Sequence, residues 1–529
     1  MDLSDASKTT ADVKGGILHV TMQPSPDLDA AVFDEWYNNE HGPTRLRMPD
    51  IFSSGVRYRA IDDSLPCFMA LYDITRMSLL ETKRYTSLRE TRSSREASVV
   101  AKVNIHRLFW DCVLTRSDST WKHDGAQPVT VSVEITLRED VEGAGELLET
   151  WFKEEHIKML AKVPGWKRSR LLRASDKTTR YLALHDYAQE NGLDGEAHHE
   201  AMTSKMLAEA VADKKQRTWA LYYVFGAAAR DLANLKRLPA SAGVDDGRLR
   251  TTAGHDAAIE SSIVTRDGLT IPYRLEGSGL CNAPVVAFSN SLLTSLHMWD
   301  PFIALLKRAR PELQLLRYDT RGRHALPQPA KAADLARLCD DVMELLDALH
   351  ISKLHAFVGV SMGGATALRL AVEEQSARRV GRIVAADCNA ASTPANTQAW
   401  RERLVLGETS MAALAEQNVA RWLHPNNRSN SKLATWLREM VAANNVDGFK
   451  HSCTALWDFD VRPQLPACKM PALLVVGEAD AQGNMAKTMQ AFSPMLGQEG
   501  APLSILPETG HLPMCEDPEA FLSAVRDFI

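Results

Sequence analysis

Three residues in the last third of the chain have types and an order that suit nucleophilic catalysis. Ser361 lies in the turn Gly-Val-Ser-Met-Gly, and Asp480 and His511 each follow a later apolar run. A serine hydroxyl becomes a good nucleophile when a histidine takes its proton, and a carboxylate holds that histidine in the right tautomer. The order serine, aspartate, histidine therefore predicts acyl transfer at Ser361, with His511 as the base and Asp480 as its partner.

The turn around Ser361 has small residues where such a turn needs them. Gly359 stands two residues before the serine, and Gly363 and Gly364 follow it. Side chains at these positions would collide with the following helix and the neighbouring strand. An ordinary glycine-rich turn with an idle serine is the alternative, and the later Asp480 and His511 argue against it.

Two backbone amides are predicted to bind the oxyanion of the reaction. The Met362 amide lies at the start of the helix after Ser361, where the helix dipole favours negative charge. The small polar run 289–291 follows an earlier apolar run, and the Ser291 amide is our choice for the second donor, with Leu292 next.

Asp387 and Glu478 are weaker alternatives to Asp480 as the triad acid.

Short apolar runs separated by helical stretches predict a parallel sheet for the second half of the chain. The runs are continuous rather than alternating, which is typical of strands buried on both faces. A leading hairpin at 262–265 and 271–276 is followed by the runs 284–288, 313–319, 354–359, 381–387, 471–477 and 503–507. The segment 389–465 breaks this rhythm with amphipathic, tryptophan-bearing sequence, which predicts a helical cap over a pocket.

The first 226 residues contain a repeat. The segments 36–49 and 151–164 both place a histidine five residues after a tryptophan and a proline eight residues after the histidine. The surrounding pattern of each copy predicts strand, helix, strand, strand, helix, strand, which is a ferredoxin-like unit. One such sheet leaves an apolar face bare, so we expect the two units to pack face to face around a shared cavity.

Several motifs of the C-terminal part resemble those of the α/β-hydrolase family, and of its 3-oxoadipate enol-lactonase-like branch. They are FSNSLLTSLHMWDP, LLRYDTRGRHALP, GVSMGG, VVGEAD and TGHLPMCEDPEAF, and the resemblance covers about 259–529. It implies an α/β-hydrolase fold with a helical cap and the triad given above. The pair Arg323-His324 departs from the His-Gly usual in the family, which puts the local structure of that loop in question.

The N-terminal repeats resemble dimeric α/β-barrel (EthD-like) domains, which pair two ferredoxin-like units. The predicted organisation is unit 1 at 1–126, unit 2 at 127–226, a linker at 227–258 and the hydrolase domain at 259–529. His41 and His156 hold equivalent places in the two copies and form a possible second site. Each imidazole could move protons in a cavity, or could simply bond to the backbone of its own unit.

Composition excludes several classes of protein. The net charge is −6 from 61 basic and 67 acidic residues, without long blocks of either sign, so neither nucleic acid nor a membrane is expected as a partner. The beginning of the chain has no apolar targeting segment, and the eight cysteines show no paired spacing. These features predict a cytoplasmic protein with reduced thiols, without a metal or cofactor, and the repeats allow but do not require an oligomer.

The predicted function is hydrolysis of a lactone or ester through an acyl-enzyme on Ser361. The tryptophans of the cap favour a medium-sized small molecule, partly apolar or aromatic-derived, as substrate. Two alternatives stay open: a C–C bond hydrolase with the same triad, and a ligand receptor on a hydrolase fold with slow turnover. The barrel module would be a cyclase- or isomerase-like partner of the hydrolase, or a scaffold.

Overall fold

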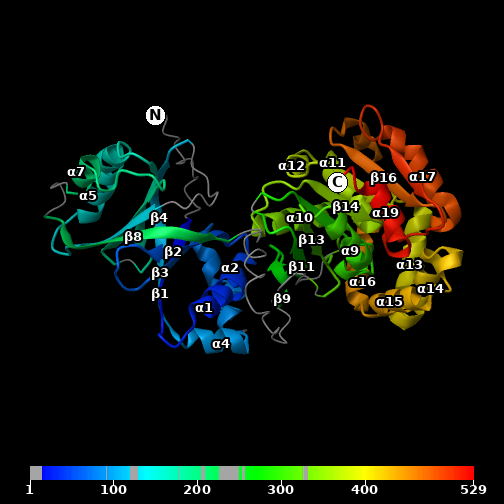
Figure 1. The fold of residues 1–529 in the computed structure, drawn as a ribbon, viewed down its shortest axis with the longest axis horizontal. Helices are drawn as coiled ribbons and strands as arrows, with labels where there is room; N and C mark the ends of the chain where they lie inside the picture. The colour runs from blue at the N-terminus through cyan, green and yellow to red at the C-terminus, as the bar shows by residue number, and fades with distance from the viewer. Residues whose placement is uncertain are drawn as a thin grey trace. The chain divides into compact units, whose positions relative to one another are not determined.

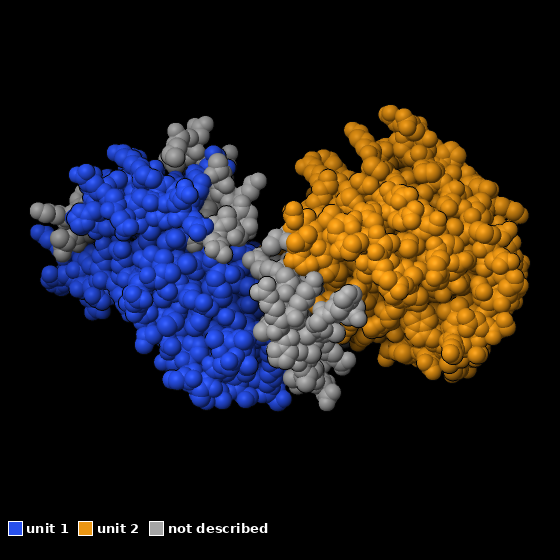
Figure 2. Space-filling view, viewed as in Figure 1, with its two compact units in different colours: residues 1–225 blue, residues 226–529 orange. Residues whose placement is uncertain are grey.

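The computed structural model describes residues 15–90, 92–119, 129–176, 178–203, 209–225, 250–252, 257–280, 282–324, 326 and 332–529. The chain divides into two compact units, residues 1–225 and 226–529, which Figure 2 colours separately. Each unit has its own sheet and its own core. In the described residues no helix combines the length and the apolar character needed to cross a membrane.

The first unit is built on a closed barrel of eight strands (Figure 1). Around the barrel the strands follow the order β1-β3-β2-β8-β5-β7-β6-β4, and all neighbours are antiparallel. The strands are β1 (Gly16–Pro24), β2 (Phe52–Ala60), β3 (Phe68–Ile74), β4 (Val103–Ser117), β5 (Val129–Leu137), β6 (Trp166–Ala174), β7 (Arg180–Tyr187) and β8 (Val211–Val224).

Each half of the first unit contributes four consecutive strands. The orders within the halves are β4-β1-β3-β2 and β8-β5-β7-β6, and the halves join through the pairs β2–β8 and β4–β6. The expectation of two sheets packed face to face is therefore wrong. Closing the barrel pairs the four sheet edges, whose backbone groups would stay unpaired in separate sheets, so edge pairing decides the arrangement.

Short helices connect the strands, and both halves contain a π-helical turn at the same place in the repeat. The turn η1 (Tyr37–His41) lies between α1 (Ala30–Trp36) and α2 (Gly42–Leu46). The turn η4 (Phe152–His156) lies between α5 (Ala144–Trp151) and α6 (Ile157–Leu160). The second helical layers are η2 (Met77–Glu81), α3 (Lys83–Thr86), η3 (Ser87–Arg89), α4 (Ser94–Val100) and α7 (Glu196–Met202). A π turn adds one residue to the helix and often marks a functional site.

The barrel strands separate two apolar environments because successive side chains point to opposite faces. Leu184 belongs to a cluster shared by both halves, with Trp110 and Trp219. The preceding residue, Ala183, packs instead with Phe152 and other helical residues of the second half. The interior of the barrel is therefore filled with side chains, and the helices cover the other face of the strands.

The second unit contains a nine-stranded sheet in the order β17-β16-β15-β14-β12-β13-β11-β10-β9. Strands β12 to β17 are parallel to one another, and β11, β10 and β9 continue the sheet from β13 in antiparallel pairs. The strands are β9 (Arg250–Thr252), β10 (Ala258–Val264), β11 (Thr270–Gly277), β12 (Val285–Ser289), β13 (Gln314–Tyr318), β14 (Ala356–Val360), β15 (Ile383–Ala386), β16 (Ala472–Gly477) and β17 (Leu503–Leu506). The runs that form β12 to β16 are buried throughout, as predicted, whereas the edge strand β17 is partly exposed, with Ile505 at 40%.

Helices pack on both faces of this sheet. Phe288 and Phe302 belong to one apolar cluster, and Phe357, Val342 and Leu368 belong to the other. The helices outside the cap are α9 (Asp300–Ala309), α10 (Leu335–Ala348), α11 (Met362–Val372), α12 (Glu374–Ala377), α17 (Asn484–Phe492), α18 (Pro513–Glu516) and α19 (Pro518–Val525). The cap, yellow to orange in Figure 1, consists of α13 (Pro394–Thr409), α14 (Met411–Trp422), α15 (Ser431–Ala442) and α16 (Val446–Cys453).

The predicted linker falls mostly outside the described residues, which omit 226–249 and 253–256. Within it, Arg250–Thr252 form β9 and pair antiparallel with β10. These three residues are therefore part of the sheet of the second unit rather than linker, because the edge of β10 offers them backbone partners.

Candidate active site

Ser361 occupies the sharp turn between β14 and α11 in a strained backbone conformation. Its φ of 58° and ψ of −114° lie outside the regions that residues with a side chain prefer. A Cβ atom added to Gly359 would lie 2.0 Å from the Gly363 carbonyl oxygen, and one added to Gly363 would lie 2.4 Å from the Ser289 carbonyl oxygen. Glycine at these two positions therefore permits the close approach that holds Ser361 in the turn.

Four residues lie at one edge of the sheet, just beyond the carboxyl ends of β14, β15, β16 and β17. These strands are parallel neighbours, so their carboxyl ends share that edge. Ser361 and Asp387 directly follow the first two of these strands, and Asp480 and His511 follow the last two. The Ser361 amide donates a hydrogen bond to the Ala386 carbonyl at 2.8 Å, which ties the turn to the end of β15. The sheet topology thus collects the predicted residues from sequence positions 150 residues apart, since 361 and 511 share this edge.

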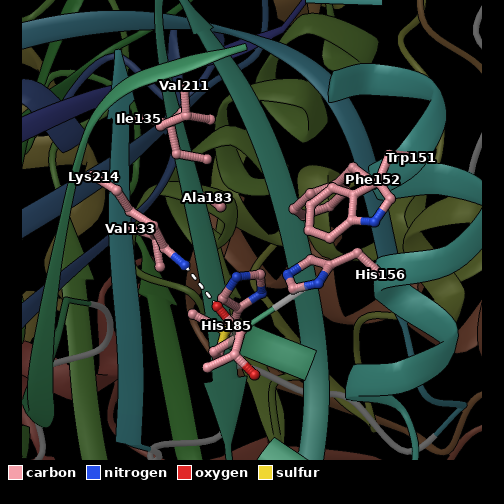
Figure 3. Close-up of a pocket in the computed structure, with 11 residues that line it drawn as sticks. Val133, Ile135, Trp151, Phe152, His156, Ala183, His185, Val211 and Lys214 are labelled. Carbon is pink, nitrogen blue, oxygen red and sulfur yellow. Dashed lines mark hydrogen bonds between the residues drawn. The ribbon is translucent and has the colours of Figure 1, made fainter. Parts of the chain in front are cut away.

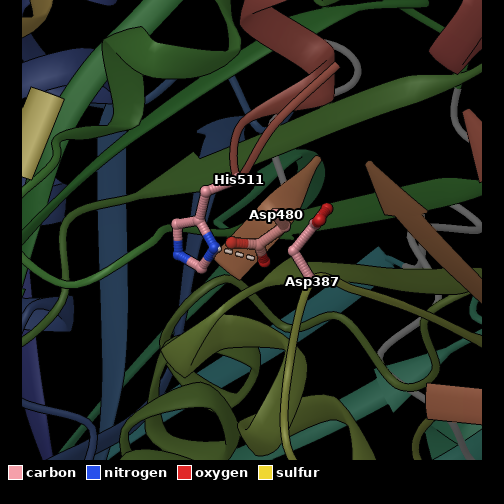
Figure 4. Close-up of side chains that lie close together, drawn as sticks. All are labelled: Asp387, Asp480 and His511. Atoms are coloured by element: carbon pink, nitrogen blue, oxygen red, sulfur yellow. Dashed lines mark hydrogen bonds and ion pairs between the residues drawn. The ribbon is translucent and has the colours of Figure 1, made fainter. Parts of the chain in front are cut away.

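His511 and Asp480 form a buried hydrogen-bonded pair (Figure 4). The distance from His511 Nδ1 to Asp480 Oδ2 is 2.8 Å, and the residues are 9% and 5% exposed. The His511 amide donates to the Trp422 carbonyl at 2.7 Å, and the Trp422 ring stacks on the imidazole with centroids 6.0 Å apart. Asp480 thereby favours the tautomer with a proton on Nδ1 and leaves Nε2 as the basic nitrogen.

A second carboxyl group, that of Asp387, lies in the same cluster. Asp387, Asp480 and His511 each offer an atom within 4.8 Å of the others, a spacing that could also hold a metal ion. Asp387 is 1% exposed, and the Gly477 amide donates to its Oδ1 at 2.8 Å. Burial, and next the neighbouring Asp480 carboxylate, raises the pKa of Asp387 well above its usual value. A raised pKa makes Asp387 a weaker metal ligand, and the direct bond from Asp480 to His511 suits a hydrogen-bonded cluster better.

The two predicted oxyanion donors lie in fixed segments. Met362 is the first residue of α11, so its amide has no acceptor within the helix. The Ser291 carbonyl accepts from the Thr294 hydroxyl at 2.6 Å and from the Thr294 amide at 3.1 Å. The Asn290 carbonyl accepts from the Gly363 amide at 3.1 Å, which joins this loop to the serine turn. These contacts place the two segments side by side, and the role of the Met362 and Ser291 amides remains a prediction.

The unusual pair Arg323-His324 connects the loop after β13 to its surroundings. Arg323 Nη1 donates to Asn444 Oδ1 at 3.0 Å and to the Met440 carbonyl at 3.3 Å, both in or beside the cap helix α15. His324 Nε2 lies 2.6 Å from Asp319 Oδ2. Residues 323 and 324 are therefore held by contacts of their own side chains, and Arg323 links this part of the loop to the cap.

His41 belongs to a hydrogen-bonded chain in the first unit. Its Nδ1 lies 2.7 Å from Glu96 Oε1, its Nε2 lies 3.0 Å from Arg45 Nη1, and Trp36 Nε1 donates to Glu96 Oε2 at 2.7 Å. Burial, and next the Arg45 charge, lowers the pKa of His41 to about 4. Burial alone would raise the pKa of Glu96, but the hydrogen bond from His41 and the other nearby donors and charges lower it to about 2. At neutral pH His41 is thus a neutral imidazole that donates to an ionised Glu96 and accepts from Arg45.

His156 lines a pocket of about 300 Å³ in the second half of the barrel (Figure 3). Its ring stacks on Trp151 with centroids 4.3 Å apart and meets the His185 ring at 5.5 Å. Burial, and next His185, lowers the pKa of His156 well below its usual value. The pocket wall is largely apolar, and Lys214 Nζ donates to the Met202 carbonyl at 3.0 Å.

The expectation that His41 and His156 share one cavity is wrong. They line two different pockets, each between the helices and the strands of its own half. The physical reason is that both residues end π turns in the helical layer, whereas the barrel interior is filled by residues such as Trp110 and Trp219.

Sequence reasoning missed several residues of both sites. Glu96 and Trp422 reach His41 and His511 from distant elements, and their sequence positions give no signal of this contact. Arg45 could have been found, because it follows His41 by four residues and residues so spaced face each other on a helix.

Comparison with known proteins gives relatives of the second unit. Residues 293–524 match the alpha/beta hydrolase family. 3-Oxoadipate enol-lactonase 1 from Acinetobacter baylyi is 33% identical over 276 residues, which are 51% of this chain and 97% of that protein. 3-Oxoadipate enol-lactonase 2 from the same organism is 32% identical over 250 residues, 47% of this chain and 89% of that protein. The solved structure of the enol-lactonase from Burkholderia xenovorans LB400 is 30% identical, covers 50% of this chain and 98% of that one, and has a TM-score of 0.44.

Proposed function

Since the chain belongs to the alpha/beta hydrolase family and is a hydrolase of the lactonase or esterase type, we propose that Ser361, His511 and Asp480 form its catalytic triad. The observation that carries this proposal is the 2.8 Å bond between His511 and Asp480 at the sheet edge where Ser361 is held in its strained turn. That bond leaves His511 Nε2 as the base for the serine proton.

The reaction has two stages, acylation and deacylation. Ser361 Oγ attacks the carbonyl carbon while His511 Nε2 takes the hydroxyl proton, and the amides of Met362 and Ser291 bind the oxyanion. The C–O bond to the leaving oxygen breaks, and His511 returns the proton to that oxygen. A water molecule then loses a proton to His511 and attacks the acyl carbon. The bond from that carbon to Ser361 Oγ breaks, His511 returns the proton to Oγ, and a carboxylic acid is released.

The substrate that the cap favours is a medium-sized lactone or ester with a carboxylate. Burial, and next Arg421, lowers the pKa of Arg403 to about 10. Burial also lowers the pKa of Arg421, on which the Asp480 charge acts in the opposite direction. Neither arginine forms an ion pair with a carboxylate within the described part of the chain, and a substrate carboxylate would supply that partner. The names of the two similar enol-lactonases refer to 3-oxoadipate, which is a dicarboxylate.

For the first unit we infer a tandem of two ferredoxin-like units, as in dimeric α/β barrels, spanning 1–126 and 127–226. The strand orders β4-β1-β3-β2 and β8-β5-β7-β6 support this, because they repeat one βαββαβ arrangement twice. The module serves the hydrolase as a cyclase- or isomerase-like partner or as a scaffold.

Intact-mass measurement tests the triad directly. The full-length protein is mixed with a panel of five-membered enol-lactones and 4-nitrophenyl esters, with and without a carboxylate, and quenched with acid. The expected result is an acyl adduct that maps to Ser361 and is absent from Ser361→Ala. Turnover that persists in Ser361→Ala contradicts the proposal.

The same panel tests the substrate class. Arg421→Gln is expected to raise KM about tenfold for substrates with a carboxylate and to leave neutral esters unchanged, because one charge-assisted hydrogen bond is lost. An equal effect on both groups of substrates contradicts a carboxylate role for Arg421. Product analysis separates this chemistry from C–C cleavage, which yields a shortened ketone, and slow turnover with tight binding would instead indicate a receptor.

A further inference from the structure

The first half of the barrel contains a pocket whose walls differ in charge from those of the equivalent pocket in the second half. It has a volume of about 340 Å³, within the range of about 300–1,000 Å³ typical of ligand sites. Arg45, Arg89, Arg92 and Arg107 line it, together with one carboxylate, that of Glu96. The excess of positive charge in a hollow of this size favours an anion as its occupant.

Two of these arginines carry buried N–H groups without a partner. Within the described residues, neither Arg45 Nε nor Arg107 Nε has a hydrogen-bond acceptor, and Arg45 is only 9% exposed. The one carboxylate of the pocket is already used, because Glu96 binds His41 and Trp36. A buried guanidinium N–H that lacks an acceptor is costly, and a ligand carboxylate would satisfy it.

The remaining wall of the pocket is partly apolar. Tyr85, Leu88 and Phe109 line it beside the arginines. Aromatic and aliphatic side chains of this kind contact a flat or apolar ligand body. Free phosphate, which lacks such a body, would leave this wall unused.

The equivalent pocket in the second half shows what the repeat looks like without the arginines. It contains His156, but mainly apolar side chains surround it, and Lys214 already donates to the Met202 carbonyl. The position of the histidine is shared by both copies, and the cluster of arginines belongs to the first. The arginines are thus not required by the repeat fold itself.

From these observations we propose that the pocket around Arg45 and Arg107 is a binding site for a small organic carboxylate with an aromatic or apolar body. The carboxylate accepts from the guanidinium groups of Arg45 and Arg107, which line the pocket, and the exposed Arg89 and Arg92 attract it. His41 lies beside the bound anion, because its Nε2 is 3.0 Å from Arg45 Nη1. This site is separate from Ser361 and does not depend on the proposed triad.

Calorimetric titration of the full-length protein with benzoate tests the proposal. The expected result is saturable binding that is absent with benzamide, which has the same shape without the charge. Arg107→Gln is expected to weaken binding about tenfold or more, because it removes one charge-assisted contact. The imidazole resonances of His41, assigned with His41→Gln, should shift on addition of benzoate.

Matched controls locate the effect. Lys214→Gln, in the His156 pocket, should leave benzoate binding unchanged. Saturable binding should remain in Arg421→Gln, which removes the carboxylate partner proposed for the hydrolase site. Arg89→Gln gives a second reading on an exposed residue if Arg107→Gln fails to fold. The proposal is overturned if benzoate does not saturate, if binding survives both arginine variants, if Arg421→Gln abolishes it, or if inorganic phosphate binds as tightly as benzoate.

Discussion

Each unit of this protein contains a histidine bonded to a buried carboxylate, and the two pairs have almost the same geometry. His511 Nδ1 lies 2.8 Å from Asp480, and His41 Nδ1 lies 2.7 Å from Glu96. The pairs differ at the other ring nitrogen. His41 Nε2 accepts from Arg45, whereas His511 stacks on Trp422 at the edge where Ser361 turns.

This difference shows that a histidine–carboxylate pair does not define a site by itself. Beside a guanidinium, the Nε2 lone pair of His41 is occupied, and burial and the Arg45 charge keep the imidazole neutral. At the sheet edge, the proposed triad has His511 Nε2 accept a proton from Ser361. Under the two proposals, the neighbour at Nε2 decides between a base for catalysis and a support for an anion pocket.

The largest expected effect is a loss of hydrolysis when a residue of the proposed triad is removed. Ser361→Ala and His511→Ala should each lower kcat by roughly 10³-fold or more, and the double variant should lose little further, since the residues act as one unit. Ester hydrolysis and fluorophosphonate labelling measure this. His41→Gln is the matched control, and a comparable loss of hydrolysis in that variant would mean that the two pairs serve one reaction.

The next effect separates the two acids beside His511. Asp480→Asn should also lower kcat by roughly 10³-fold or more, because the amide favours the wrong tautomer of His511. Asp387→Asn should cost less than about tenfold, because a neutral acid is replaced by a neutral amide that can still accept from the Gly477 amide. Equal losses in the two variants, or a larger loss in Asp387→Asn, would reverse the assignment of the acid.

On the barrel side, Glu96→Gln should reduce stability rather than hydrolysis. The hydrogen bonds from His41 and Trp36 lose their charged acceptor, which costs about 2 kcal/mol. In calorimetric unfolding, the transition temperature of the first unit should be lower in this variant. The kcat for ester hydrolysis should be unchanged. Glu155→Gln, an exposed acid before His156, is the control with an expected change below about 0.5 kcal/mol.

The stability of the first unit is also expected to depend on pH. The pKa of His41 is lowered to about 4 and that of His185 to about 3, in both cases mainly by burial. Below about pH 6.5 the unfolded chain binds protons that the folded barrel does not, so stability should fall as pH drops from about 6.5 towards 4. Each histidine contributes a slope of at most about 1.4 kcal/mol per pH unit. His185→Asn should flatten this slope in thermal unfolding at pH 7 and pH 5, and an unchanged slope would contradict the assignment.

Local sequence signals were enough to predict most strands of the second unit and the turn around Ser361. Continuous apolar runs predict strands buried on both faces, and the glycines around Ser361 predict a turn that only small neighbours allow. Both signals are local, so they could be read without knowing the fold. The α/β-hydrolase fold expected for the C-terminal part and the assignment as a hydrolase are confirmed by the family match and the relatives, and the bounds 259–529 stay a prediction.

The features that depend on residues far apart in the chain could be read only from the tertiary structure. They are the acid that pairs with His511 and the way the sheet edges of the first unit join. The sequence places Asp387 and Asp480 after strands, but only the packed cluster pairs His511 with Asp480 and buries Asp387, whose pKa burial raises. In the first unit, the periodicity of two repeats predicted their strands but not how the sheet edges join. Edge pairing closes one barrel, fills its interior, and leaves His41 and His156 under separate helices with different neighbours. The charge around a histidine depends on side chains from other elements, and residue spacing along one segment does not contain that information.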